Sequence, residues 1–581
     1  MKKLFKKILF ILIVFIWSSL ILAQDDILPV SQIKPGMTGY GKTVFQGTAI
    51  EKFDVEIISV LKNIRPEGDL ILARLSGKTV DKAGIIAGMS GSPVYIQDKI
   101  IGALAFSWSF SKEPIAAITP IEDMLEIIER KYNTNFYNIH HPFKEYYVKD
   151  NKDNLQVLKI PLAFQGITEA GFDIFKEQFK NMGFFPMAGG EAGKDIQVPD
   201  KFEPGSAVAV NLITGDLNLS AIGTVTYVKQ NKILIFGHPM FFSGSTDLPM
   251  SHAYIHTVLP SLYQSFKIGS ATKTVGKIFQ DQLGGLAGVM DQKAGLIPFQ
   301  LDVNYQGVLK QYNFGLIKTY HMLPSLLSLC LYRSIEKAGG WWENNTLDFE
   351  FTVQFDNKSS MVLKDTIPGI NLLDSLQTGM LLFLKPISEI LMNKFEKVSI
   401  TSIKGELKIN TRIKMLEIQK MICDQREYYP GETVKARIVL KEYQGNTRSK
   451  DIEFKIPYNT PEGKFPLIVS SGREAQYVDF LLSPSKYMPY SFAHFLEIIN
   501  TLSKTTELAI WSMSKDKGLM VNGEKLERIP DSYFSMLKNS LESGAMPVFT
   551  LLKEDLTLPY VIIGNTSQMI DIKKRSIQRK K

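Results

Sequence analysis

The sequence has few of the residues that build disulfide scaffolds or metal centres. Cys330 and Cys423 are the only cysteines among 581 residues, so the fold cannot depend on a disulfide framework. Histidine is also scarce, with seven residues. His252 and His256 have the i,i+4 spacing of a zinc pair, but no glutamate follows His252 as in the HExxH pattern and no third ligand is apparent. We therefore predict neither a metal ion nor a cofactor.

Long uninterrupted apolar runs are missing as well, except at the N-terminus. The apolar segment 367–392 is broken by charged residues such as Asp374 and Lys385. At the N-terminus, a lysine-rich start precedes an apolar stretch from Ile8 to Leu22 and the small residue Ala23. This stretch is shorter than the roughly 20 residues of a spanning helix. We predict a signal peptide over 1–23, with an uncleaved anchor as the alternative. The mature protein is then extracytoplasmic, periplasmic or secreted, with no stable membrane span.

A basic surface is not indicated, although the formal net charge is +8. Four lysines lie in the predicted signal peptide and six basic residues crowd the last nine positions, so the rest of the chain is slightly acidic. We expect no nucleic-acid partner. The basic C-terminal tail is interpreted as a solvated terminus, with attachment to an acidic surface as the alternative.

The most informative stretch is Gly88-Met89-Ser90-Gly91-Ser92-Pro93, which lies between apolar segments with the composition of strands. A serine between glycines on a tight loop is a candidate nucleophile. Its hydroxyl needs a base to take the proton and N–H groups to receive the developing oxyanion. The two glycines would allow the backbone N–H groups to converge on one point. On its own, the string is more typical of a glycine-rich turn between two strands than of a nucleophile.

This motif resembles the Gly-Asp-Ser-Gly-Gly-Pro signature of chymotrypsin-like peptidases and is still more similar to the nucleophile motif of the SpoIVB peptidase family. Met89 stands where the chymotrypsin signature has its aspartate, so the N-terminal salt bridge of that signature is not available. Further segments that resemble the family are 53–57, 82–86 and 119–125 around the serine, and 223–227 with Ile235-Phe-Gly237-His238-Pro239 for the histidine.

The resemblance implies a site as well as a fold. It implies Ser90 as the nucleophile, His238 as the general base, and the N–H groups of Gly88 and Ser90 as oxyanion donors. It also implies a mainly β protein with some α, built on a chymotrypsin-like double β-barrel. In familiar members of the family the histidine block precedes the serine block, whereas here Ser90 comes first, so we expect the two half-domains in swapped order.

The acidic member of a triad is not evident. Its position in the family, about fifteen residues before the serine, is Leu75 in this chain. Asp81, Asp216 and Asp247 are candidates to replace it, and we name Asp81 as the third member. A Ser–His dyad and an inactive relative both stay open.

The pattern of strands and turns indicates several domains. Residues 27–300 form the predicted peptidase domain, with a serine half at 27–130, a linker and small α/β insert at 133–204, and a histidine half at 205–300. Helical spacing of apolar residues over 121–132 predicts a closing helix. We further predict a β-rich domain with helices at 301–415, an immunoglobulin-like β-sandwich segment at 416–470, and an α+β region with the basic tail at 471–581.

The function predicted from these features is a secreted serine endopeptidase of SpoIVB type. Its expected partners are protein or peptide substrates of the cell envelope, and self-processing is a variant of the same activity. The alternative is a catalytically inactive envelope protein that keeps the peptidase fold and acts as a binding or scaffold module.

Overall fold

The computed structural model describes residues 27–574, except 66–67, 109–110, 131–154, 191–192, 194–195, 337–342, 522–523, 527–528 and 539–545. The predicted signal peptide and the basic end of the tail, 575–581, therefore lie outside the described residues. The chain divides into two compact units. One contains the residues up to Leu296 together with Gly315–Lys318, and the other contains Ile297–Phe314 and the residues from Thr319 onward. The finer domain boundaries predicted above stay predictions.

The first unit begins with a closed barrel. Its strands pair in the order β5-β1-β2-β3-β7-β6, and β5 also pairs with β6, which closes the ring. The bounds are β1 Thr38–Thr43, β2 Glu51–Arg65, β3 Gly68–Ser76, β5 Pro93–Ile96, β6 Lys99–Ser107 and β7 Ile115–Pro120. In β2, Phe53, Val55 and Ile57 are buried while Asp54 and Glu56 between them are exposed, so the alternation of the sequence separates the barrel interior from its surface.

A second barrel follows in the same unit. Its ring runs β12-β13-β16-β15-β14-β11, and a pairing of β11 with β12 closes it. The bounds are β11 Ala207–Gly215, β12 Asn218–Lys229, β13 Lys232–Ile235, β14 Gly244–Leu259, β15 Ser265–Gln282 and β16 Gly285–Met290. The predicted chymotrypsin-like double barrel is thus confirmed. The barrel that carries the serine loop comes first in the chain.

Several smaller elements hold the two barrels together. The two-residue strand β4, Ile86–Ala87, pairs in parallel with the start of β15 and leads directly into the serine loop. The helix α3, Ile121–Glu129, confirms the helix expected there. Its apolar face shares a core with residues of both barrels, among them Ala103, Leu234 and Phe279.

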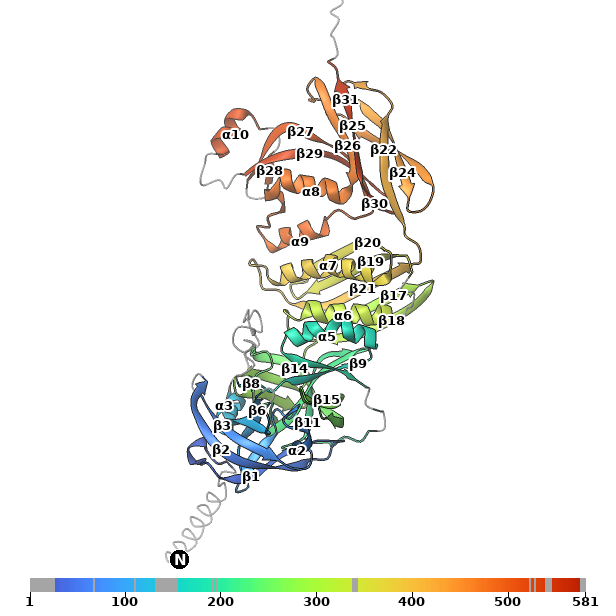
Figure 1. Cartoon of the computed structure of the whole chain (residues 1–581). Helices are drawn as coiled ribbons and strands as arrows, with labels where there is room; N and C mark the ends of the chain where they lie inside the picture. Colours follow the sequence, from blue (N-terminus) through green and yellow to red (C-terminus); the bar gives the residue numbers. More distant parts are fainter. Residues whose placement is uncertain are drawn as a thin grey trace, which may run out of the picture. The chain divides into compact units, whose positions relative to one another are not determined.

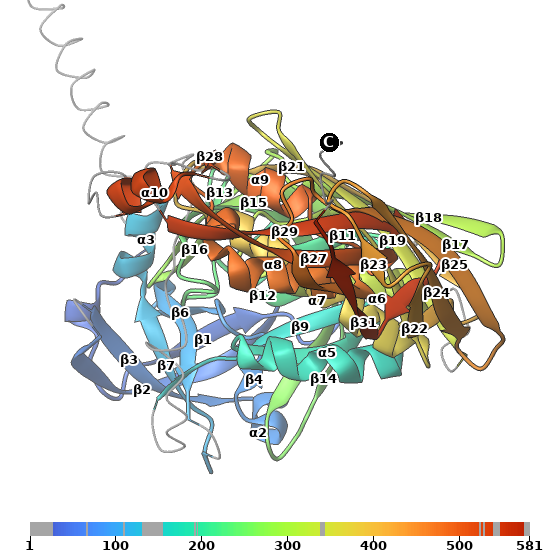
Figure 2. The same ribbon diagram turned by 90° about the horizontal axis from the view of Figure 1, so that it is seen from above.

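A helix covers one edge of the second barrel. The strands β9, Ile160–Gln165, and β10, Phe184–Gly189, pair in parallel, and β9 pairs with β12. Between them runs α5, Glu169–Asn181, which buries Phe175 and Phe179. The ring of Phe164 on β9 makes edge contacts with Phe172 and Phe179 of α5. Figures 1 and 2 both show α5 running alongside β9.

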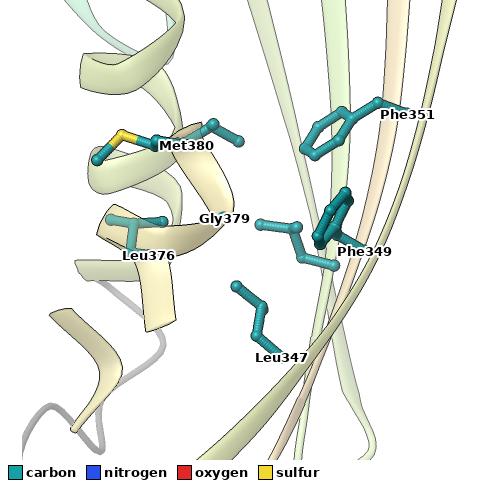
Figure 3. A pocket seen from close by; sticks show the side chains of 8 residues that line it. Leu347, Phe349, Phe351, Leu376, Gly379 and Met380 are labelled. Atoms are coloured by element: carbon teal, nitrogen blue, oxygen red, sulfur yellow. The ribbon is translucent and has the colours of Figure 1, made fainter. Parts of the chain in front are cut away.

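The second unit starts with a sheet covered by helices. The strand order is β18-β17-β21-β19-β20, with β17 Ile297–Tyr305, β18 Val308–Leu316, β19 Asn345–Phe355, β20 Ser360–Gly369 and β21 Ile400–Asn410. The helices are α6, Leu323–Glu336, and α7, Leu372–Leu391. A small apolar pocket lies between α7 and the sheet, where Gly379 faces Leu347, Phe349 and Phe351 (Figure 3).

The remainder of this unit contains two sheets that share one hydrophobic core. One sheet has the order β25-β24-β22-β30, and the other contains β23-β31-β26-β27-β28 with β29 on β27. The bounds are β22 Met415–Cys423, β23 Glu427–Tyr428, β24 Thr433–Glu442, β25 Thr447–Lys455, β26 Gly463–Ser471, β27 Glu507–Val521, β28 Glu524–Leu526, β29 Met546–Thr557, β30 Val561–Ile563 and β31 Asn565–Ile572. The helices are α8 Gly472–Leu482, α9 Phe492–Asn500 and α10 Asp531–Lys538. This is a β-sandwich with added helices, and its immunoglobulin-like character stays a prediction.

Within the described ranges, none of the helices combines the length and the apolar character needed to cross a membrane.

Candidate active site

The serine loop consists of two successive tight turns. The N–H of Met89 donates to Ile86 O at 3.0 Å, and the N–H of Ser92 donates to Met89 O at 2.9 Å. The third residue of each turn is a glycine with positive φ, Gly88 at 95° and Gly91 at 90°. Type II turns require this conformation at the third position, and an L side chain there is strained. The spacing of the two glycines therefore follows from the backbone, and it places Ser90 at the second position of the second turn.

Two threonines of β12 hold this loop from the second barrel. The N–H of Thr224 donates to Ser90 O at 3.0 Å, and its hydroxyl donates to Gly88 O at 3.0 Å. The hydroxyl of Thr226 donates to Gly91 O at 2.7 Å. Three carbonyl groups of the loop are thus bound by one strand. The N–H of Ser90 donates to no group of the described chain.

His238 comes from the end of β13, directly beside the same loop. An added Cβ on Gly91 would lie 2.5 Å from Phe236 N, so the serine loop packs on the strand end without room for a side chain. The carbonyl of Gly237 accepts a hydrogen bond from the Thr119 hydroxyl at 2.6 Å. Both residues named by the family resemblance therefore lie on segments that the fold brings into contact, although they are far apart in the sequence.

The imidazole of His238 is fully buried, and its Nδ1 lies 2.9 Å from Pro239 O. Because a carbonyl oxygen can only accept, Nδ1 carries the proton and Nε2 has the lone pair. Nε2 itself has no partner in the described part of the chain. Burial lowers the pKa of His238 to about 4, so the ring is neutral at neutral pH. This is the tautomer that a general base toward a serine hydroxyl needs.

Ser90 is likewise fully buried, and its Oγ has no hydrogen-bond partner among the described residues. Ser90 Oγ and His238 Nε2 therefore do not bond to each other in this conformation. A buried polar atom without a partner costs about 1–3 kcal/mol, and natively folded proteins contain few of them. Two such atoms on adjoining segments, one a hydroxyl donor and one a nitrogen acceptor, are complementary.

The structure does not bring a sequence-predicted aspartate to His238. Asp81, in the short helix α2 (Val80–Ala83), accepts from Gly77 N at 3.1 Å. Asp247 on β14 pairs with Lys277 at 3.2 Å, and Asp216 lies in the turn between β11 and β12. Leu75, at the acidic position of the family, is a buried core residue of β3. The group that orients His238 is instead the main-chain carbonyl of Pro239.

A different aspartate holds the histidine segment. Asp281 at the end of β15 is fully buried and accepts from Met240 N at 2.9 Å and from Phe241 N at 2.6 Å, with longer contacts to Ser243. Burial raises its pKa to about 6, although these donors favour the charged form. Asp281 thereby fixes the loop that follows His238 and Pro239. Nothing in the sequence around Asp281 distinguished it, because its partners are main-chain N–H groups about forty positions away.

The other residues considered as metal ligands make ordinary packing and hydrogen-bond contacts. His252 on β14 stacks on Phe202 with 4.0 Å between ring centroids, and His256 Nε2 lies 2.8 Å from Ser270 Oγ. Across the described ranges, no group of three or more histidine, cysteine, aspartate or glutamate side chains has a geometry that could hold a metal ion. Cys330 and Cys423 are both free thiols.

One known protein family matches the part of the chain that contains the serine loop. Residues 23–124 match the family model of SpoIVB peptidase S55. The match contains the serine loop and β1 to β7 and ends in α3, so His238 lies outside it. It supports a serine peptidase of SpoIVB type at the level of the family. Comparisons with curated proteins and with solved structures gave no match.

Proposed function

We propose that this protein is a secreted serine endopeptidase of SpoIVB type, with Ser90 as nucleophile and His238 as general base. The observation that carries the proposal is the pair of buried, unpartnered atoms Ser90 Oγ and His238 Nε2 on segments that pack against each other. A conformation in which these two atoms form a hydrogen bond would satisfy both. The SpoIVB match over the serine-bearing barrel supports the same reading.

In the proposed reaction, Ser90 Oγ attacks the carbonyl carbon of the scissile peptide while its proton passes to His238 Nε2. The N–H groups of Gly88 and Ser90 receive the oxyanion. His238 then gives its proton to the leaving amine, and the same ring activates the water that hydrolyses the acyl-enzyme. The Pro239 carbonyl holds the ring in the reactive tautomer but carries no full charge. It therefore stabilises the imidazolium less than a carboxylate would.

The test is the rate at which a fluorophosphonate probe labels the purified protein. Ser90→Ala and His238→Ala are expected to abolish labelling. Ser92→Ala is the matched serine control, because Ser92 Oγ is also buried and unpartnered two residues further on. His256→Ala is the matched histidine control. Labelling that survives Ser90→Ala, or that disappears equally in Ser92→Ala, contradicts the assignment of the nucleophile.

The second candidate is an inactive envelope protein that uses the peptidase fold to bind a partner. Leu75 at the family's acidic position and the lack of a hydrogen bond between Ser90 and His238 favour it. Absence of labelling in wild-type protein that is folded by circular dichroism would select this candidate.

The substrates that we propose are proteins of the cell envelope, including the chain itself. Cleavage of either substrate in the envelope depends on export by the predicted signal peptide at 1–23. Cell fractionation tests the location. Mass spectrometry of the termini, in wild type and in Ser90→Ala, tests self-processing, because a self-made terminus is absent from the variant.

A further inference from the structure

Lys267 on β15 is a buried cation directly behind the serine loop. Its side chain is fully buried, and its aliphatic carbons lie 3.2–3.3 Å from the place where a Cβ on Gly88 would be. Its Nζ donates to Thr43 Oγ1 at 2.6 Å and lies 3.4 Å from Thr224 Oγ1. Thr224 is the residue whose hydroxyl and N–H bind Gly88 O and Ser90 O.

No carboxylate compensates this amine within the described chain. Its neighbours on the packed elements are Thr43 on β1, Thr224 on β12, Val258 opposite it on β14, and Gly88 after β4. None of these can ionise.

The nearest ionisable residues on the same strands are engaged elsewhere. Lys42 Nζ lies over the Tyr95 ring at 5.0 Å, and His256 bonds to Ser270. Burial lowers the pKa of Lys267 to about 7. Burying an amine without a counter-ion is costly, and a purely structural position would be filled at less cost by an apolar side chain.

The protonation state of Lys267 limits where the Thr224 proton can point. An ammonium group has three donors and no acceptor, so Thr224 Oγ1 can only accept from it and keeps its own proton for Gly88 O. A neutral amine has a lone pair that can accept a hydrogen bond from a neighbouring hydroxyl. Where Thr224 donates that bond, Gly88 O loses its donor, and the loop loses one of the bonds that fix it.

We propose that Lys267 is a positioning residue that, when protonated, holds the oxyanion-binding loop of Ser90 through the hydroxyl of Thr224. The inference rests on the proposed peptidase function and deepens it. It makes the reactivity of Ser90 fall as pH rises, opposite to the trend that a histidine base alone would give.

The experiment measures fluorophosphonate labelling rates between pH 5 and pH 9, with thermal midpoints of unfolding at each pH. Wild type is expected to lose roughly tenfold in rate as the pH rises through about 7, a loss below that of an oxyanion donor. Lys267→Met and Thr224→Val should label slowly with no decline on the alkaline side. Thr224→Ser, which keeps the hydroxyl, should restore the wild-type profile.

Thr226→Val is the matched control, because Thr226 donates to Gly91 O of the same loop and, among the described residues, has no hydrogen bond with Lys267. It should lower the rate and keep the alkaline decline. A decline that persists in Lys267→Met and in Thr224→Val overturns the inference while leaving the peptidase intact. A wild type that does not label at any pH overturns the proposed function, and the inference with it.

The thermal midpoints give a readout that does not depend on activity. The unfolded chain binds more protons at position 267 than the folded chain between about pH 7 and about pH 10.5, so wild type gains stability over that interval. Lys267→Met should not show this gain. If the thermal midpoints of wild type and Lys267→Met depend on pH in the same way, Lys267 is not neutral in the folded protein above about pH 7. This result would also contradict the inference. If Lys267→Met does not fold, the pair Thr224→Val and Thr224→Ser carries the test.

Discussion

His238 Nδ1 lies 2.9 Å from the carbonyl oxygen of Pro239, the next residue in the chain. A main-chain carbonyl therefore occupies the place of the carboxylate in a serine peptidase triad. It selects the same tautomer, but it supplies no negative charge to raise the pKa of the ring. Burial is then the dominant influence, and it lowers that pKa to about 4.

The loss of activity at acidic pH should follow from the pKa of His238. A general base works only while neutral, and His238 is expected to become protonated near pH 4 and not near pH 6.5. The contribution of His238 to the labelling rate should therefore stay level as the pH falls from about 6.5 to about 5, and should halve near pH 4. Asp281, with a pKa of about 6, titrates separately, and Asp281→Asn removes that titration from the profile. A midpoint near pH 6.5 would show that the ring is solvated in the reactive state. Circular dichroism at each pH separates protonation from acid unfolding.

Gly91 is expected to tolerate no side chain. In Gly91→Ala, the new Cβ would lie 2.1 Å from Thr224 O and 2.5 Å from Phe236 N, and the positive φ adds strain. We expect a loss of more than about 3 kcal/mol in the free energy of unfolding, together with the loss of labelling. Gly84→Ala is the matched control, because Gly84 has a positive φ of 66° but no atom within 4 Å of an added Cβ. It should cost only the backbone strain of about 1–3 kcal/mol that a side chain meets at φ 66° and ψ −149°. Equal losses in urea unfolding of both variants would contradict the steric argument.

Asp281→Asn should loosen the segment that carries His238. Oδ1 of Asp281 accepts from Met240 N and Oδ2 accepts from Phe241 N, so an amide NH2 in place of either oxygen meets one of these donors and the two bonds cannot both be kept. We expect the labelling rate to fall at least tenfold. Because Asp281 has a raised pKa of about 6, the folded state binds more protons than the unfolded state between about pH 4 and pH 6. Wild type should therefore gain stability from this group as the pH falls through that interval.

Asp281→Asn lacks the titration of the Asp281 carboxyl group. The difference between the thermal midpoints of wild type and Asp281→Asn should consequently change between pH 7 and pH 4. A constant difference means that Asp281 is not the buried titrating carboxylate. Asp247→Asn serves as the control, because Asp247 pairs with Lys277 away from His238.

Which structural features can be predicted from the sequence depends on how far apart in the chain the contacting residues lie. The helix predicted over 121–132 follows from a local pattern, and α3 at Ile121–Glu129 confirms it. The alternation of Phe53, Val55 and Ile57 along β2 is equally local. The double barrel was predicted through the resemblance of the serine motif, because short apolar strands alone do not specify how barrels close. Both Ser90 and His238 were named in the same way, and their catalytic roles stay predictions.

The remaining site residues could not be found from sequence because their partners are distant or belong to the main chain. Lys267 reaches Thr43 across 224 positions, and Asp281 binds backbone N–H groups that every residue type except proline supplies. The orienting role of Pro239 comes from a carbonyl, which leaves no trace in the choice of side chain. A search for an acidic side chain therefore pointed to Asp81, which accepts from Gly77 N at the start of α2.

Gly379 in α7 provides a test of the second unit that leaves the candidate site untouched. Glycine inside a helix costs about 1 kcal/mol relative to alanine, and Gly379 lines the apolar pocket between α7 and the sheet (Figure 3). An added Cβ would lie 3.0 Å from Ile367 Cδ1, which is the movable end of a side chain. We expect Gly379→Ala to raise the free energy of unfolding by up to about 1 kcal/mol and to leave labelling unchanged.

Gly369→Ala, at the end of β20, is the contrasting variant. There an added Cβ would lie 2.0 Å from Ser375 Oγ and 2.7 Å from Asn371 O, so the turn into α7 has to move. This variant should be destabilised by about 1–3 kcal/mol in the same urea titration. If Gly379→Ala is destabilised as well, Ile367 is held too firmly by its neighbours to yield. Closer packing of α7 on this sheet would then require a smaller residue at position 367.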